Sequence, residues 1–164
     1  MITVRILPLW LLCVGALFGC AGQPPAPSGP AQQVRGNDSA EAAGLQVFTL
    51  RDPMVIELSE AALRAEQARD WSQAAQLLNR ALQLAPDDPG LLQQRAELHL
   101  EQSQWAEALS LAAQSYDLGP KVGALCQRNW RTKALAHSRL SDEAAARQAQ
   151  RQLEACVVRP PERF

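Results

Sequence analysis

The chain has 164 residues, 20% of them charged, and a formal net charge of −1. This length accommodates one domain of ordinary size and additional segments. The near-neutral charge gives no overall attraction to nucleic acid or to anionic lipid, which argues against nucleic-acid-binding functions. Because Leu, Ala, Gln, Glu and Arg dominate and aromatic residues make up only 5%, helices are favoured over strands.

The first segment, residues 1–19, has the pattern of a secretory signal. One basic residue, Arg5, precedes an apolar run of thirteen residues from Ile6 to Phe18. A membrane-spanning helix needs about 20 apolar residues. We therefore expect a removed signal peptide, with a retained membrane anchor as the alternative.

The sequence Leu-Phe-Gly-Cys at residues 17–20 resembles the lipobox of bacterial lipoproteins. In that family the cysteine is lipidated on its sulfur and becomes the new N-terminus. The resemblance implies that Cys20 is acylated, and Ala21 at the next position implies delivery to the outer membrane. The alternative is ordinary signal cleavage that leaves a free cysteine.

Residues 20–52 are predicted to be a disordered linker behind the lipidated cysteine. From Ala21 to Gly44 the chain has four prolines, four glycines and no aromatic residue, so it has little to bury. The linker spans at most ~110–120 Å when fully extended from Cys20 to Pro53. The apolar stretch Leu45 to Leu50 either packs along the first helix of the domain or occupies a binding groove and competes with a partner.

The remaining chain, residues 53–157, is predicted to form one helical domain, followed by a tail at 158–164. Asp52-Pro53 and Asp88-Pro89 have the pattern of a helix N-cap followed by a first-turn proline. Proline, tryptophan and polar turn residues mark further helix ends. Helices are expected over 53–68, 71–84, 89–102, 105–117, 122–139 and 142–157.

Part of this domain repeats itself at an offset of 34 residues. The sequence that begins at Arg69 recurs from Ser103, so that Trp71 corresponds to Trp105 and Ala74 to Ala108. This pattern resembles the tetratricopeptide repeat, a helix–turn–helix unit that stacks into a superhelix. The resemblance implies an all-α array of about three antiparallel helix pairs. The third pair is weaker and has one or two added residues near the turn at 139–143.

Two cysteines remain in the domain, Cys126 and Cys156. In an antiparallel hairpin, residues pair about the turn, and residue 141 lies midway between these two. We expect a disulfide that closes the weakest repeat, as suits an oxidising compartment. Two separately buried thiols are the alternative.

No pattern for catalysis or for a cofactor is visible in the chain. The histidines, His99 and His137, lie on separate predicted helices, and no cluster has the spacing of metal ligands. Glycine-rich phosphate loops and nucleophile–base arrangements are also lacking. We therefore expect no enzyme activity, no metal and no cofactor.

A groove lined by the first helix of each repeat is the predicted place for a protein partner. The repeat alignment places Gln93, Glu97, Gln127 and Arg131 along this groove. Trp130 either fills the core of the last repeat or is a partly exposed anchor for a partner, since tryptophan and arginine are common at interface hot spots.

The combination of lipobox, Pro/Ala-rich linker and compact repeat domain is similar to the LpoP-type lipoproteins, outer-membrane activators of bifunctional penicillin-binding proteins. This resemblance implies a lipid-anchored module that faces the periplasm. Its partner would be a class A penicillin-binding protein in peptidoglycan synthesis. The alternative is a pilotin-like or general envelope-assembly scaffold lipoprotein.

Overall fold

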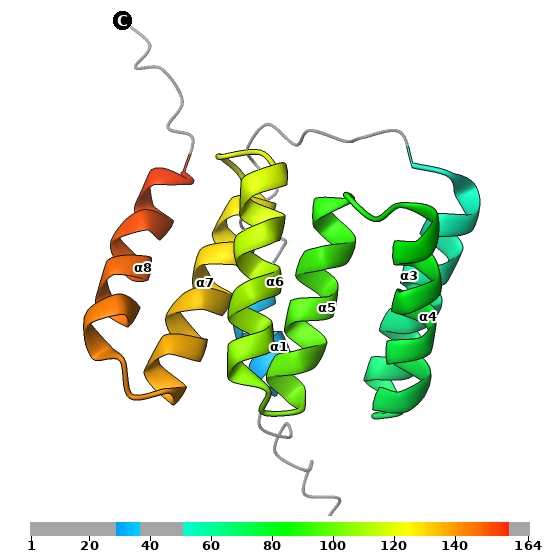
Figure 1. Ribbon diagram of the computed structural model, residues 1–164, viewed down its shortest axis with the longest axis horizontal. Coiled ribbons are helices and arrows are strands. Elements are labelled where there is room, and N and C mark those ends of the chain that lie inside the picture. Colours follow the sequence, from blue (N-terminus) through cyan, green and yellow to red (C-terminus); the bar gives the residue numbers. More distant parts are fainter. Residues whose placement is uncertain (1–28, 37–50, 158–164) are drawn as a thin grey trace, which may run out of the picture.

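The computed structural model describes residues 29–36 and 51–157, and these residues form seven α-helices and no strand (Figure 1). The predicted all-α fold is confirmed. Six helices match the six predicted ones to within two residues at each end. The helices are α1 (Pro30–Arg35), α3 (Pro53–Gln67), α4 (Trp71–Leu84), α5 (Pro89–Glu101), α6 (Trp105–Leu118), α7 (Ala124–Arg139) and α8 (Glu143–Ala155).

Aspartates cap the N-termini of four helices. Each side chain accepts a hydrogen bond from a backbone N–H in the first turn, which satisfies a donor that has no partner within the helix. The pairs are Asp52 with Met54 N, Asp70 with Gln73 N, Asp88 with Leu91 N and Asp142 with Ala145 N. These caps explain why the helix starts were readable from the sequence.

The helices pack as three antiparallel pairs, α3 with α4, α5 with α6 and α7 with α8, and consecutive pairs stand side by side (Figure 1). The turn inside each pair contains one residue in the left-handed region: Arg69, Ser103 or Ser141, with φ of 59°, 58° and 64°. Fully buried alanines such as Ala74 and Ala108 let the paired helices approach closely.

The third pair corrects the expected position of its added residues. The turns within the second and third pairs have equal length, because each joins its two helices through three residues, 102–104 and 140–142. The extra residues lie earlier instead: α7 has 16 residues where α5 has 13, and the loop at 119–123 is one residue longer than the loop at 85–88. The buried counterpart of Ala108 is therefore Ala146, thirty-eight residues later.

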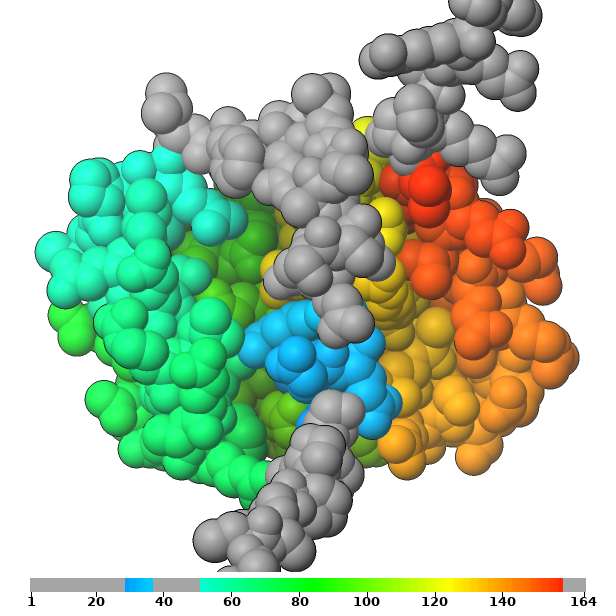
Figure 2. Space-filling view, turned by 180° about the vertical axis from the view of Figure 1, so that it is seen from behind, coloured from blue at the N-terminus to red at the C-terminus, as the bar shows by residue number. Residues whose placement is uncertain are grey.

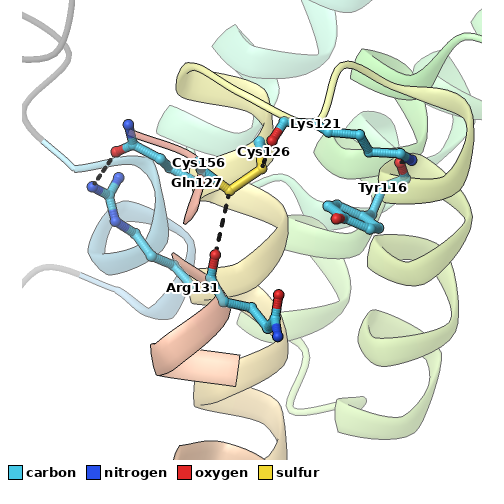
Figure 3. Close-up of a disulfide and its surroundings, with 7 residues drawn as sticks. Tyr116, Lys121, Cys126, Gln127, Arg131 and Cys156 are labelled. Carbon is cyan, nitrogen blue, oxygen red and sulfur yellow. Dashed lines mark hydrogen bonds between the residues drawn. A yellow bond between two sulfur atoms is a disulfide. The ribbon is translucent and has the colours of Figure 1, made fainter. Parts of the chain in front are cut away.

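A disulfide joins the two ends of the last helix pair (Figure 3). Cys126 lies in the first turn of α7 and Cys156 follows the last residue of α8, with a Cα–Cα distance of 5.6 Å. Beside it, Gly123 N donates a hydrogen bond of 2.8 Å to the carbonyl of Cys156. The free ends of α7 and α8 are thus held together opposite their turn.

One predicted linker segment is a helix instead. Residues 30–35, which were expected to be part of a disordered linker, form α1. The signal peptide (1–19), the lipidation site Cys20, the Leu45 to Leu50 stretch and the tail (158–164) lie outside the described residues. Among the described helices, none has the length and apolar character needed to cross a membrane.

Removing the disulfide should destabilise the domain. It closes a loop across a sequence separation of 30 residues, which corresponds to ~3–4 kcal/mol in the chain-entropy treatment. Urea unfolding of the oxidised chain should therefore show a higher midpoint than unfolding in the presence of reductant. A double variant, Cys126→Ser with Cys156→Ser, should match the reduced chain and be insensitive to reductant; equal midpoints for the oxidised chain and the double variant would contradict the expectation.

Candidate functional site

The first helix of each pair faces the concave side of the array, and α1 lies in this hollow. Figure 2 shows α1 in blue between α3 and α4 on one side and α7 and α8 on the other. It packs mainly against α5 and α7. We call the concave surface formed by α3, α5 and α7 the groove.

Local sequence explains why α1 begins and ends where it does. Pro30 occupies the first helical position, and Gly36 follows the helix with a φ of 69°, a conformation that glycine adopts without strain. A helix of six residues is unstable in isolation because nucleation is costly. The helix therefore depends on its contacts with the groove.

Two apolar side chains attach α1 to the groove. Ala31 and Val34 are 3% and 2% exposed, and they lie three residues apart on one face of the helix. Val34 packs into a cluster formed by Leu100, Ala108 and Ala136, one residue from each of α5, α6 and α7. The cluster extends the core of the array into α1.

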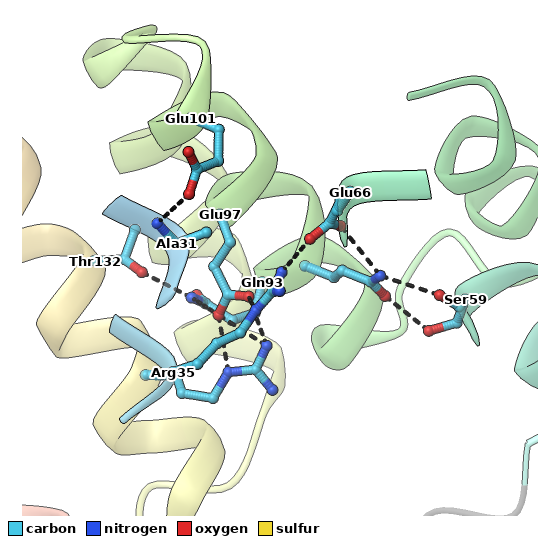
Figure 4. Close-up of polar contacts among 10 residues, drawn as sticks. Ala31, Arg35, Ser59, Glu66, Gln93, Glu97, Glu101 and Thr132 are labelled. Carbon is cyan, nitrogen blue, oxygen red and sulfur yellow. Dashed lines mark hydrogen bonds and ion pairs between the residues drawn. The ribbon is translucent and has the colours of Figure 1, made fainter. Parts of the chain in front are cut away.

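Arg35, the last residue of α1, connects two helices of the groove through ion pairs (Figure 4). Its Nε donates to Glu97 Oε2 of α5 at 2.6 Å, and its Nη2 donates to Glu66 Oε2 of α3 at 2.5 Å. The side chains of Glu97 and Glu66 are 0% and 4% exposed. A single guanidinium thus serves two buried carboxylates.

Glu97 has a second cation and an amide as partners. Arg128 of α7 donates Nε to Glu97 Oε1 and Nη2 to Glu97 Oε2, both at 2.8 Å. Gln93 Nε2 donates to Glu97 Oε1 at 2.9 Å and to Thr132 Oγ1 at 2.7 Å. The Glu97 carboxylate is therefore the point at which α1, α5 and α7 are joined.

Glu66 has fewer partners within the groove. Apart from Arg35, it accepts a hydrogen bond of 3.4 Å from Gln94 Nε2, whose own oxygen accepts a bond of 2.7 Å from Ser59 Oγ. Among the described residues, Arg35 is the only ion-pair partner of Glu66. The charge of Glu66 therefore depends on α1 more than the charge of Glu97 does.

The two carboxylates respond differently to these surroundings. Burial raises the pKa of Glu66, and the positive charge of Arg35 offsets only part of that effect. Burial alone would also raise the pKa of Glu97, but the charges of Arg128 and Arg35 outweigh it and hold this pKa below the ordinary value. For Arg35 itself, burial would lower the pKa, yet Glu97 and Glu66 raise it.

A third carboxylate of the groove holds the start of α1. Glu101 Oε1 accepts a hydrogen bond of 2.8 Å from the backbone N–H of Ala31. This approach is close, because a Cβ atom on Gly29 would lie 2.4 Å from the same oxygen. The groove therefore contacts α1 at its first turn through Glu101 and at its last residue through Glu97 and Glu66.

The structure brings together four of the five predicted partner-binding residues at or beside the groove. Gln93 and Glu97 form its buried floor. Arg131 donates to Gln127 Oε1 at 3.1 Å, and its guanidinium lies next to Gly36. Trp130 lies apart from them, packed edge-to-face on Tyr116 of α6 with a centroid distance of 5.0 Å.

Sequence reasoning missed Arg35 and Glu101. Both belong to contacts between segments far apart in the chain, separated by 62 residues for Arg35 with Glu97 and by 70 for Ala31 with Glu101. The available signal was local: Gly-Pro before the segment, Gly after it, and apolar residues three positions apart. This pattern indicates a short helix but does not say where it binds.

The histidines have local roles. His99 Nδ1 lies 2.6 Å from Gln104 Oε1, and His137 Nδ1 lies 3.6 Å from Asp142 Oδ2. Within residues 29–36 and 51–157, no group of three or more His, Cys, Asp or Glu side chains is arranged to hold a metal ion.

Replacing Glu97 by glutamine should destabilise the chain strongly at neutral pH. The substitution keeps the shape but leaves Arg35 and Arg128 without their shared counter-charge, a loss of about 3 kcal/mol for a buried ion pair. The matched control is Glu60→Gln, because Glu60 and Arg64 form a pair at 3.9 Å with side chains 65% and 64% exposed. The control should change the free energy of unfolding by less than about 0.5 kcal/mol in urea denaturation.

The loss of stability caused by Glu97→Gln should also become smaller at acidic pH. A carboxylate whose pKa is lowered by folding stabilises the protein above its unfolded pKa, and this contribution is lost as the pH falls through the folded value. The free energy of unfolding of the wild-type chain should therefore approach that of the variant below pH 4.5, the ordinary pKa of glutamate. If the difference in free energy of unfolding between the wild type and the variant stayed constant until the chain unfolds in acid, the charge of Glu97 would not be the cause of that difference.

The comparison with known families agrees with this arrangement. Residues 65–121 match the family model described as the tetratricopeptide repeat. No curated protein and no solved structure matches the chain. The matched segment runs from the end of α3 through α6, and the described helices form a tetratricopeptide-like array of antiparallel pairs, a scaffold that suggests a protein-interaction module.

Proposed function

We propose that this chain is a protein-interaction module that takes a segment of its partner into the groove. The observation that carries the proposal is the groove itself, which holds α1 through buried carboxylates from two helices and through an apolar cluster. A surface that binds one short helix in this way has the shape and charge needed to bind another.

The proposal extends to where the module works. The lipobox ending at Cys20 and the proline-rich residues behind it suit a lipoprotein anchored in the outer membrane and facing the periplasm. The disulfide between Cys126 and Cys156 supports an oxidising compartment.

A class A penicillin-binding protein is the proposed partner, which the module activates in peptidoglycan synthesis. With α1 released from the groove, the thirty-three residue steps from Cys20 to Pro53 would reach at most ~110–120 Å, which suits a partner beyond the peptidoglycan layer.

The proposed anchor can be tested with two cysteine variants. Cys20→Ala should remove the acyl groups from the mature chain and release it from the membrane fraction. Cys13→Ala, in the segment expected to be removed, is the matched control and should leave the mass and location of the mature chain unchanged. Mass spectrometry of the purified chain and membrane fractionation give the result; an unacylated wild-type chain would refute the anchor.

The proposed partner can be identified by crosslinking inside cells. A photo-crosslinkable residue at Leu63, on the rim of the groove, should capture a bifunctional penicillin-binding protein, whereas one at Arg80, an exposed residue of α4, should not. The purified chain should then accelerate glycan polymerisation by that enzyme.

Three outcomes would overturn the proposed partner. One is capture of a secretin or another assembly component at Leu63, which would favour the envelope-scaffold alternative. A second is equal capture at both positions. The third is a polymerisation rate that does not change when the purified chain is added.

A further inference from the structure

We propose that the groove recognises a short helical protein segment with a small apolar residue, a second apolar residue three positions later and an arginine next to it, and that α1 is its resident occupant. The partner's segment must displace α1 to bind. This inference rests on the proposed function, because it names the kind of segment that the partner inserts.

Buried negative charge makes the groove selective for a cation. Glu66 and Glu97 are almost completely excluded from solvent, and a buried carboxylate without a counter-charge is strongly destabilising. Arg128 supplies one cation to Glu97, but Glu66 relies on the residue that enters with α1. An occupant without a positive charge would leave that carboxylate buried and unneutralised.

The geometry favours arginine over lysine. Arg35 uses two different nitrogens, Nε for Glu97 of α5 and Nη2 for Glu66 of α3, so the planar guanidinium spans two helices. A lysine ammonium is a single compact charge and cannot match this fork. The groove therefore distinguishes the two basic residues.

The apolar contacts set the register of the occupant. Val34 fills a place in the cluster with Leu100 and Ala136, and Ala31 is buried three residues earlier on the same face of the helix. Glu101 accepts the backbone N–H of Ala31, so the first turn of the occupant is held as well. Apolar residues three apart, followed by arginine, are thus read together.

Helix α1 is short enough for a partner segment to displace it. It has six residues and two buried apolar side chains, and its helix is unstable when it leaves the groove. Because residues 37–50 connect it to the domain, α1 competes with any partner segment from within the same molecule. A partner segment with the same pattern and more contacts would overcome this local advantage, although α1 weakens its apparent affinity.

Displacement of α1 also changes how far the domain reaches from the proposed anchor. With α1 in the groove, nine residue steps separate Cys20 from Gly29, a span of at most ~30 Å. With α1 released, the span to Pro53 rises to ~110–120 Å. Partner binding would therefore lengthen the tether by freeing the segment that shortens it.

The inference can be tested with a peptide, independently of any identified partner. The probe is a fluorescent peptide with the sequence of residues 29–36 and blocked ends, together with a second peptide that has lysine in place of arginine. The proteins are the purified wild-type chain, Arg35→Ala, and the matched control Gln32→Ala, which changes an exposed residue of the same helix. Fluorescence anisotropy should show the arginine peptide binding Arg35→Ala about tenfold more tightly than the wild type or Gln32→Ala, because its competitor is weakened. The lysine peptide should bind Arg35→Ala about tenfold more weakly than the arginine peptide.

Hydrogen exchange gives a second measurement that does not depend on peptide affinity. The backbone amides of Ala31 and Gln33, which donate to Glu101 and to the Gly29 carbonyl, should be protected in the wild type and in Gln32→Ala and should exchange freely in Arg35→Ala. Unprotected amides in the wild type would overturn the inference, as would equal peptide binding to the wild type and Arg35→Ala, or no binding to Arg35→Ala. A wild-type chain that sediments as a dimer while Arg35→Ala is a monomer would show that α1 binds a second copy, and would also overturn it.

These results separate the inference from the proposed function. If the peptides bind as described but no penicillin-binding protein is captured at Leu63, the inferred recognition by the groove would be supported and the proposed partner would be refuted. Capture of that enzyme in equal yield by the wild type and Arg35→Ala, without peptide binding, would keep the partner and refute displacement of α1.

Discussion

The buried carboxylate of Glu97 is the interaction on which the groove depends. It lies on the central helix α5 and is 0% exposed, and it is neutralised by Arg128 from α7 and by Arg35 from α1. Loss of Arg128 would leave Arg35 to serve both Glu97 and Glu66, and loss of Arg35 would leave Glu66 without its ion-pair partner among the described side chains. The relative positions of the middle pair, the last pair and α1 are therefore coupled through one group.

This coupling gives the concave surface its chemical character. Helical arrays of this kind expose the first helix of each pair, and here those helices contribute Glu66, Glu97 and Glu101 to one side of a single short helix. The same groups that hold α1 would hold a partner segment of similar chemistry. Under the proposed function, stability and recognition draw on the same contacts, so that a partner segment must supply what α1 supplies.

Most of the array was readable from the sequence because its signals are local. Aspartate caps, first-turn prolines and polar turns lie within a few residues of the helix ends that they determine. The position of the added residues in the third repeat was predicted wrongly. They lie in α7 and in the loop before it, whereas the turn at 140–142 keeps its length. Buried positions such as Ala146 reveal the offset only once the helices are packed.

The sequence by itself determined the helix boundaries, the antiparallel pairing and the general position of the groove, since these follow from spacing along the chain. Only the tertiary structure decided what the groove contains. A six-residue segment such as α1 has too few contacts of its own to be helical, and it becomes so because it contacts Glu101, Glu97 and Glu66, which lie at least 31 positions away in the sequence. Such long-range charge pairing leaves no periodic trace in the sequence.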